Sequence, residues 1–177
     1  MRSKRGQPPF FADKEDSHEL SASAQSCRLS HRRKEASWAH QIATAVIFTS
    51  PLLVYGGHPR SLLDNPAADM IKSIPSVWDE TVVLPGSEIG EIAAMARRQG
   101  KDWFVAVVNG AGPRRVQIAP TFLGSTGYTA LGVRDDPDDP AAVRIERGDR
   151  QPQDALIVEL RVGGGFVARF TPGEAGS

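Results

Sequence analysis

The sequence predicts a mainly β protein: an antiparallel β-sandwich that follows a short helix–strand–helix segment and a disordered amino-terminal tail. After Pro75, short runs of alternating polar and apolar residues recur between clusters of Gly, Pro and Asp, as in sandwich strands. Before Pro75, helical and buried-strand patterns follow one another, which is typical of α/β folds. The predicted divisions are a tail at 1–36, the helix–strand–helix segment at 37–76, the sandwich at 77–172 and a disordered end at 173–177.

The composition argues against several classes of function. The formal net charge of zero gives no reason to expect a nucleic-acid or membrane partner. Cys27 is the single cysteine, so we expect no intrachain disulfide and no cysteine-rich metal site. The basic start, "MRSKRGQPPFF", lacks the apolar region of a signal peptide, and it leaves the localisation open. The four histidines are scattered without metal-ligand spacing: His18, His31, His40 and His58.

The tail at 1–36 is rich in Ser, Lys, Arg and Glu, and it has too few apolar residues to offset the entropy cost of ordering. "HRRKE" at 31–35 has the charge of a nucleic-acid patch, but nearby acidic residues favour a solvated tail. Cys27 and His31 have the helical spacing of a thiol nucleophile and its base. A disordered tail would not hold that geometry, so we expect no catalysis there.

The most apolar run of the chain is "AHQIATAVIFTSPLLVYGGHP" at 39–59. Thr49, Ser50 and Pro51 interrupt it midway, whereas a membrane span needs about 20 predominantly apolar residues. Ser37 is expected to cap a helix that runs to about Ser50, where Pro51 ends it. The apolar surface of this helix is expected to comprise Ile42, Ala45, Val46 and Phe48.

Two further elements are predicted before the sandwich. "LLVYG" at 52–56 is a continuous apolar run, which predicts a strand covered on both faces, as in a parallel sheet. Residues 60–74 predict one helix, or two short helices broken near Pro66.

Seven or eight strands are predicted in the sandwich. "EIAAMARRQG" at 91–100 has the propensity of a helix, yet we predict a strand because Gln99-Gly100 supplies a turn beside "WFVAVV". Turn-forming clusters at 110–113, 124–127 and 134–140 separate the other strands. Those strands are expected in "VWDETVVL", "RRVQIA", "GYTALGV", "AVRIER", "ALIVELRV" and "GGFVARF".

Several linked motifs resemble the carboxy-terminal part of glycoside hydrolase family 97, over roughly residues 38–172. In that family an Ala-His helix precedes a Ser-Pro-Leu strand near the end of a (β/α)8 barrel, as in "AHQIATAVIFTSPLL" here, although Thr49 stands where Glu is frequent. The other matching motifs are Pro75-x-x-Trp78-Asp79-Glu80-Thr81, Pro85-Gly86, Ala96-Arg97-Arg98, the Trp-Phe strand ending in Asn109-Gly110, and "GGGFVARF".

The resemblance implies a calcium-dependent α-glycoside hydrolase, commonly exported or periplasmic, whose terminal sandwich is non-catalytic and serves oligomerisation. Its catalytic and calcium-binding carboxylates belong to segments before the Ala-His helix, and residues 1–37 do not match them. We therefore predict no catalytic residue, no cofactor and no metal ligand, and interpret the chain as a truncated or frame-shifted product. The expected partners are a second copy or a glycosidase barrel.

Other functions would need particular residues. Asp79 and Glu80 could serve as the carboxylate pair of a glycosidase, but adjacent strand residues point to opposite faces. We expect Trp78 to pack at the junction between the barrel and the sandwich, and its acidic neighbours to cap turns or pair with arginine. "DDPDD" at 135–139 offers calcium carboxylates but lacks the Gly and distal Glu of an EF-hand, and "VGGGF" at 162–166 is a turn rather than a phosphate loop.

A carbohydrate-binding sandwich is the alternative function, and an independent hydrolase is the third. Carbohydrate binding requires exposed aromatic platforms, whereas burial of the aromatic side chains favours a structural role. The aromatic candidates are Trp103, Phe104, Phe122, Tyr128, Phe166 and Phe170.

Overall fold

The structure is a computed structural model, and it describes residues 36–48, 50–56, 58–139 and 142–173. The predicted disordered tail and end lie outside these residues, apart from Ala36 and Gly173. The predictions for Cys27, His18, His31 and Thr49 also fall outside them. Three helices are present in the described part: α3 (Trp38–Ile47), α4 (Pro59–Leu63) and α5 (Ala68–Ser73). The strands are β1 (Glu80–Val83), β2 (Ile92–Gln99), β3 (Asp102–Asn109), β4 (Arg114–Ile118), β5 (Tyr128–Asp135), β6 (Val143–Arg150), β7 (Leu156–Leu160) and β8 (Gly165–Pro172).

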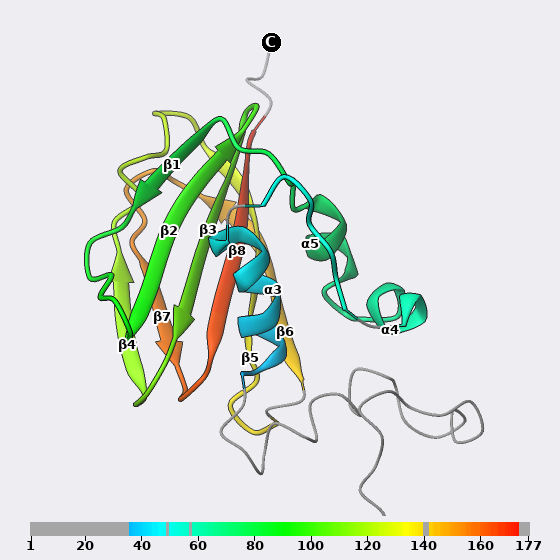
Figure 1. The fold of residues 1–177 in the computed structure, drawn as a ribbon. Helices are drawn as coiled ribbons and strands as arrows, with labels where there is room; N and C mark the ends of the chain where they lie inside the picture. Colours follow the sequence, from blue (N-terminus) through cyan, green and yellow to red (C-terminus); the bar gives the residue numbers. More distant parts are fainter. Residues whose placement is uncertain (1–35, 49, 57, 140–141, 174–177) are drawn as a thin grey trace, which may run out of the picture.

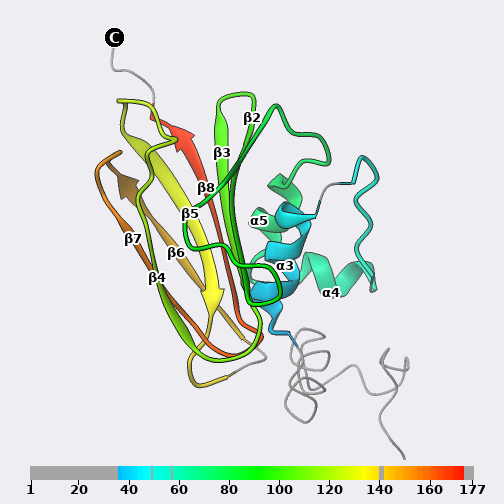
Figure 2. The ribbon, with the colours of Figure 1, turned by 60° about the vertical axis from the view of Figure 1, so that its left-hand side comes forward.

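The strands form two antiparallel sheets, which confirms the predicted mainly β fold. The larger sheet has the order β1-β2-β3-β8-β5-β6, and the smaller pairs β4 with β7. Figures 1 and 2 show three layers: the two-stranded sheet on one face of the large sheet, and α3 with α5 on the other. Residues 91–100, whose propensity also allowed a helix, contain the strand β2, as predicted. β2 pairs with β3 across a turn at Gly100, whose φ is 59°.

The large sheet therefore separates two hydrophobic cores. On β3, Trp103, Val105 and Val107 point toward the small sheet, while Phe104 and Ala106 point toward α3. This follows from the alternation of side chains along a strand. The central strands β3 and β8 are apolar on both faces because each face is covered by a different layer.

Helix α3 belongs to the packing of the sandwich. Ala39 and Val46 are fully buried on it, and they share a core with Phe104 and Val167 of the sheet. Gly165 makes this close approach possible, because a Cβ atom at that position would collide with the backbone of His40. A side chain at position 165 of β8 would therefore push the helix away from the sheet.

Two expectations for the segment before the sandwich are wrong. The helix ends at Ile47 rather than near Ser50, and Phe48 is an extended C-cap whose side chain is 67% exposed instead of part of the helical apolar surface. Residues 52–56 form no strand. Their exposure does alternate, with Leu52 and Val54 outside and Leu53 and Tyr55 half-buried, but no neighbouring strand in the described residues pairs with them.

Of the two predictions for residues 60–74, two short helices broken near Pro66 is the one that is confirmed. Residues 59–73 contain the short helices α4 and α5, with the break at Asp64–Ala67 around Pro66. Pro66 cannot donate a backbone hydrogen bond and disfavours helix in Asn65. No helix of the described residues is long and apolar enough to cross a membrane.

Candidate association surface

The acidic pair Asp79 and Glu80 lies at the start of β1, beside the turn between β2 and β3. Glu80 accepts a hydrogen bond from Nε of Arg98 at 3.1 Å, and Asp79 accepts one from the Gly100 N–H at 2.6 Å. Arg98 also lies 3.6 Å from the Asp79 carboxylate. One guanidinium and one turn amide thus engage both carboxylates, as expected of residues that fix a turn rather than flank a substrate bond.

Trp78 packs at the junction between the helical layer and the sheet. Its ring meets Phe104 edge-on, with centroids 5.3 Å apart, and the guanidinium of Arg97 lies 4.8 Å from its centre. An open depression beside it is lined in part by Pro51 and Val77. The predicted packing role of Trp78 is confirmed, and Arg97 is the residue that sequence reasoning missed there.

Arg97 connects three elements from a position that is only 3% exposed. Its Nε donates to Thr81 on β1 at 3.0 Å, and its Nη1 donates to the carbonyl of Val46 at 2.7 Å. The last carbonyls of a helix lack intrahelical partners and carry negative partial charge, so this guanidinium caps α3. Burial lowers the pKa of Arg97 from its ordinary value.

The other end of α3 is held by a buried network around Asp135. The Ser37 hydroxyl caps the helix by accepting from the His40 N–H at 3.1 Å, and it donates to Asp135. Asp135 also accepts from the Gly165 N–H at 3.1 Å. Burial raises the pKa of Asp135, while the hydrogen bonds from Ser37 and Gly165 oppose that shift only in part. The N-cap predicted at Ser37 is confirmed.

Three carboxylates of the acidic turn at 135–139 have partners within the described chain: Asp135, Asp136 and Asp138. Asp136 accepts from Nε of Arg144 at 2.8 Å and from the amides of Asp138 and Asp139, and this pairing lowers its pKa. Asp135 is buried instead at the start of α3, where it accepts hydrogen bonds from Ser37 and the Gly165 N–H. Across the described residues, no group of three or more His, Cys, Asp or Glu side chains is arranged to hold a metal.

The aromatic side chains of the sandwich are used for packing. Five of the six candidate platforms are buried: Trp103, Phe104, Tyr128, Phe166 and Phe170. The sixth, Phe122, is half-buried against Trp103, with ring centroids 5.0 Å apart. Burial of these rings favours the structural role over carbohydrate binding.

Exposed apolar side chains are concentrated instead between the end of α3 and the start of β1. Five of the nine large exposed apolar side chains of the described residues lie there, and four of these five lie within residues 48–63. We call residues 48–63 the apolar segment. Its exposed members are Phe48 at 67%, Leu52 at 75%, Val54 at 73% and Leu63 at 56%, and Val77 follows at 64%.

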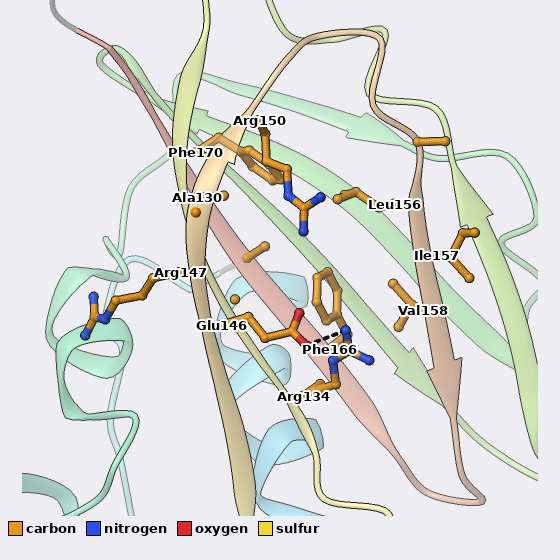
Figure 3. A pocket seen from close by; sticks show the side chains of 14 residues that line it. Ala130, Arg134, Glu146, Arg147, Arg150, Leu156, Ile157, Val158, Phe166 and Phe170 are labelled. Carbon is orange, nitrogen blue, oxygen red and sulfur yellow. Dashed lines mark ion pairs between the residues drawn. The ribbon is translucent and has the colours of Figure 1, made fainter.

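A shallow groove between β6 and β7 is the second surface feature (Figure 3). Its floor is apolar, with Phe166 and Val158 among its lining, and its rim carries Arg150 and the ion pair of Arg134 with Glu146 at 2.5 Å. Nε of Arg134 is buried without a hydrogen-bond partner among the described residues. Sequence reasoning did not predict this groove, because it forms where the small sheet stops short of β6.

The chain is similar to known glycosidases over most of its described length. Residues 77–171 match the family model described as glycosyl-hydrolase 97 C-terminal, oligomerisation. A retaining α-galactosidase of Bacteroides thetaiotaomicron is 32% identical over 134 residues, which cover 73% of this chain and 20% of that enzyme.

Solved structures agree with this likeness. A glycoside hydrolase family 97 enzyme from Pseudoalteromonas sp. strain K8, in complex with acarbose, matches 77% of this chain with a TM-score of 0.71 and 26% identity. A β-arabinopyranosidase matches 76% with a TM-score of 0.65 and 27% identity. The matches cover 23% and 21% of those chains, so this chain spans about a fifth of the length of its relatives.

The sandwich and its match define a class of protein: the non-catalytic C-terminal domain of a glycoside hydrolase. The chain belongs to the glycosyl-hydrolase 97 C-terminal, oligomerisation family. The resemblance inferred from its motifs is thereby confirmed.

Proposed function

We propose that this chain is a non-catalytic association module, which joins copies of itself and docks on a glycosidase barrel. The family description carries the proposal, because it assigns the matched residues 77–171 to oligomerisation. The closed packing of the sandwich supports it further: its aromatic rings are buried, and the candidate carboxylates Asp79 and Glu80 are engaged by Arg98 and a turn amide.

The apolar segment is the proposed docking surface for the barrel. Leu52 and Val54 point outward while Leu53 and Tyr55 point inward, which is the alternation of an extended strand. An extended segment without strand neighbours presents free backbone donors and acceptors to another chain. Exposed apolar side chains beside such an edge are typical of a surface that a partner covers. We accordingly propose that 37–76 is the segment facing the barrel and that 77–172 is the sandwich. Helix α3 of the first segment packs on the large sheet of the second.

Sedimentation of the full chain over a micromolar concentration series tests self-association. We expect dimers or larger species above the 19.1 kDa monomer, in proportions that rise with concentration. A chain that stays strictly monomeric throughout this range would contradict the proposal.

An assay with aryl α-glucoside and aryl α-galactoside, with and without calcium, tests the absence of catalysis. We expect no turnover, since glycoside hydrolysis generally needs two carboxyl groups held about 5 Å or roughly 6.5–9.5 Å apart across the bond. Calcium-dependent turnover that is lost in Asp79→Asn or Glu80→Gln would revive the enzyme hypothesis.

A further inference from the structure

The edge strand β6 is the longest unpaired strand edge among the described residues. It has eight residues, Val143–Arg150, and β5 is its only neighbour in the large sheet. The other open edges are shorter: β1 has four residues and is followed by Pro85, while β4 and β7 have five each. Proline and short length discourage pairing at an edge, so β6 is the best template for another strand.

The outer part of β6 is open to solvent. Residues 147–150 are all exposed, and Gly148 has no atom within 4 Å of the position that a Cβ would take. Figure 3 shows Arg147 on the helix side of the strand, and Glu146 and Arg150 on the groove side. The Arg150 guanidinium makes no ion pair or hydrogen bond within the described part of the chain.

Symmetry restricts how two copies of β6 can pair. A two-fold axis perpendicular to the sheet makes the strands antiparallel and keeps each side chain on its own face. Residues that face each other across the pair must then both have even numbers or both have odd numbers. The axis therefore lies midway between the two copies of one residue. An axis at Glu146 or Arg147 would set that charged residue against its own copy, which is destabilising.

An axis at Gly148 gives a charge-complementary register. Glu146 then faces Arg150 of the second copy on the groove side, and Arg147 faces Asp149 of the second copy on the helix side. The symmetry repeats both contacts, and opposite charges directly across two strands stabilise their pairing. Gly148 faces itself at the axis, where the absence of a side chain removes any clash.

An axis at Ile145 is the remaining alternative, and it is weaker. It gives one kind of ion pair, Arg144 with Glu146, whereas the axis at Gly148 gives two. Existing ion pairs do not distinguish the two registers, because Arg144, Glu146 and Arg147 are each paired within the chain, with Asp136, Arg134 and Asp69 in that order. Ile145 packs against the core beneath α3, so its side chain offers little to a second copy.

We propose that two copies of this chain associate through antiparallel pairing of their β6 strands, with the two-fold axis at Gly148. The inference rests on the proposed self-association and adds the contact surface to it. Pairing would join the two large sheets into one continuous sheet and would remove both β6 edges from solvent. Because the ion pairs are solvent-exposed, the dimer weakens as salt rises.

Cross-linking tests the register directly, in the full chain with Cys27→Ser. Directly opposed residues of antiparallel strands have Cα atoms about 4.5–5.5 Å apart, within the usual disulfide range of about 4.4–6.8 Å. Gly148→Cys is therefore expected to give a covalent dimer on oxidation. Asp149→Cys is the matched control, since its copies lie diagonally, about 7–8 Å apart, and should cross-link poorly.

Charge reversal tests the same contact without cysteine. Asp149→Arg sets like charges across the pair with Arg147, and we expect the dimer Kd to rise roughly tenfold or more. Combining it with Arg147→Asp restores opposite charges and should restore the affinity. Arg115→Glu, a charge reversal at an exposed position of β4, is the control and should leave the Kd unchanged.

The outcomes separate the two proposals. A chain that dimerises with no Gly148→Cys cross-link, and with a Kd indifferent to the β6 charges, would overturn the β6 contact and leave self-association standing. A strictly monomeric chain would overturn both. Circular dichroism of each variant establishes that a lost dimer does not reflect a lost fold.

Discussion

Helix α3 and the apolar segment that follows it are neighbours in the sequence with opposite environments. Ile42, Ala43 and Val46 of the helix are at most 2% exposed, whereas Leu52 and Val54 of the apolar segment are more than 70% exposed. Leu52 and Val54 are as apolar as Ile42 and Val46, so the nature of these side chains does not explain the contrast. The difference lies in what covers them: β3, β8 and β5 cover α3, and no described element covers the outer side of the segment.

This contrast shows which part of residues 37–63 the folded unit buries. The large sheet needs α3, because without it Phe104, Leu131 and Val167 would lose their cover. Deleting residues 1–74 would therefore strip a core along with the apolar segment, and loss of association in such a deletion would be ambiguous. Point substitutions separate the two roles.

The largest expected effect compares equal truncations in the two stretches. Ile42→Ala should lower the free energy of unfolding by about 2–5 kcal/mol, because it leaves a cavity in a packed core. Leu52→Ala should change it by less than about 0.5 kcal/mol, since that side chain is already in water. Urea denaturation of both variants measures the difference, and similar losses for the two would break the comparison.

The next effect concerns the close approach of α3 to β8. Gly165→Ala places a methyl group against the His40 backbone, so we expect a loss of about 1–3 kcal/mol in the free energy of unfolding. Gly148→Ala, measured at concentrations where the chain is monomeric, is the matched control on an exposed strand, where a Cβ meets nothing within 4 Å. Equal effects of the two substitutions would mean that α3 does not sit against Gly165.

A smaller effect depends on pH and on Asp135. Burial raises its pKa in the folded protein above the value of about 3.9 for the unfolded chain, so the folded state binds the proton more tightly. Its contribution to stability is full below pH 4 and is lost as pH rises through the folded pKa. Asp135→Asn removes this titration, so the stability of the wild type relative to the variant should fall as pH rises.

Denaturation of both proteins at a series of pH values from 3.5 to 7 checks this. A difference that is constant over the series, or one that grows with pH, would show that burial does not govern the Asp135 carboxyl.

Sequence reasoning recovered the sandwich because its signals are local. Alternation and turn residues marked the strands, and "WFVAVV" beside Gln99-Gly100 decided correctly for a strand in β2. The strand expected at 52–56 failed because a strand needs partners, and the described chain supplies none. Exposure still alternates from Leu52 to Tyr55, as it does in a strand, but no strand forms there.

The contacts that hold α3 on the sheet were predicted less completely because they join residues far apart in the sequence. The roles of Trp78, Asp79 and Glu80 followed from their position at a strand start. The capping of α3 by Arg97 joins residues 51 apart, and the bond of Ser37 to Asp135 joins residues 98 apart. Neither contact leaves a periodic signal in the sequence, and the charge register of β6 becomes visible only once β6 is known to be an edge.

Hydrogen exchange of the full chain tests most directly the claim that the folded unit includes α3 and leaves the apolar segment for a partner. Amides of α3 should exchange as slowly as those of β3 and β8, because they open only with the shared core. Amides of residues 53–56 should exchange fast in the monomer, since they lack strand partners. Fast exchange throughout α3, or strong protection of 53–56 in a monomeric sample, would contradict the account.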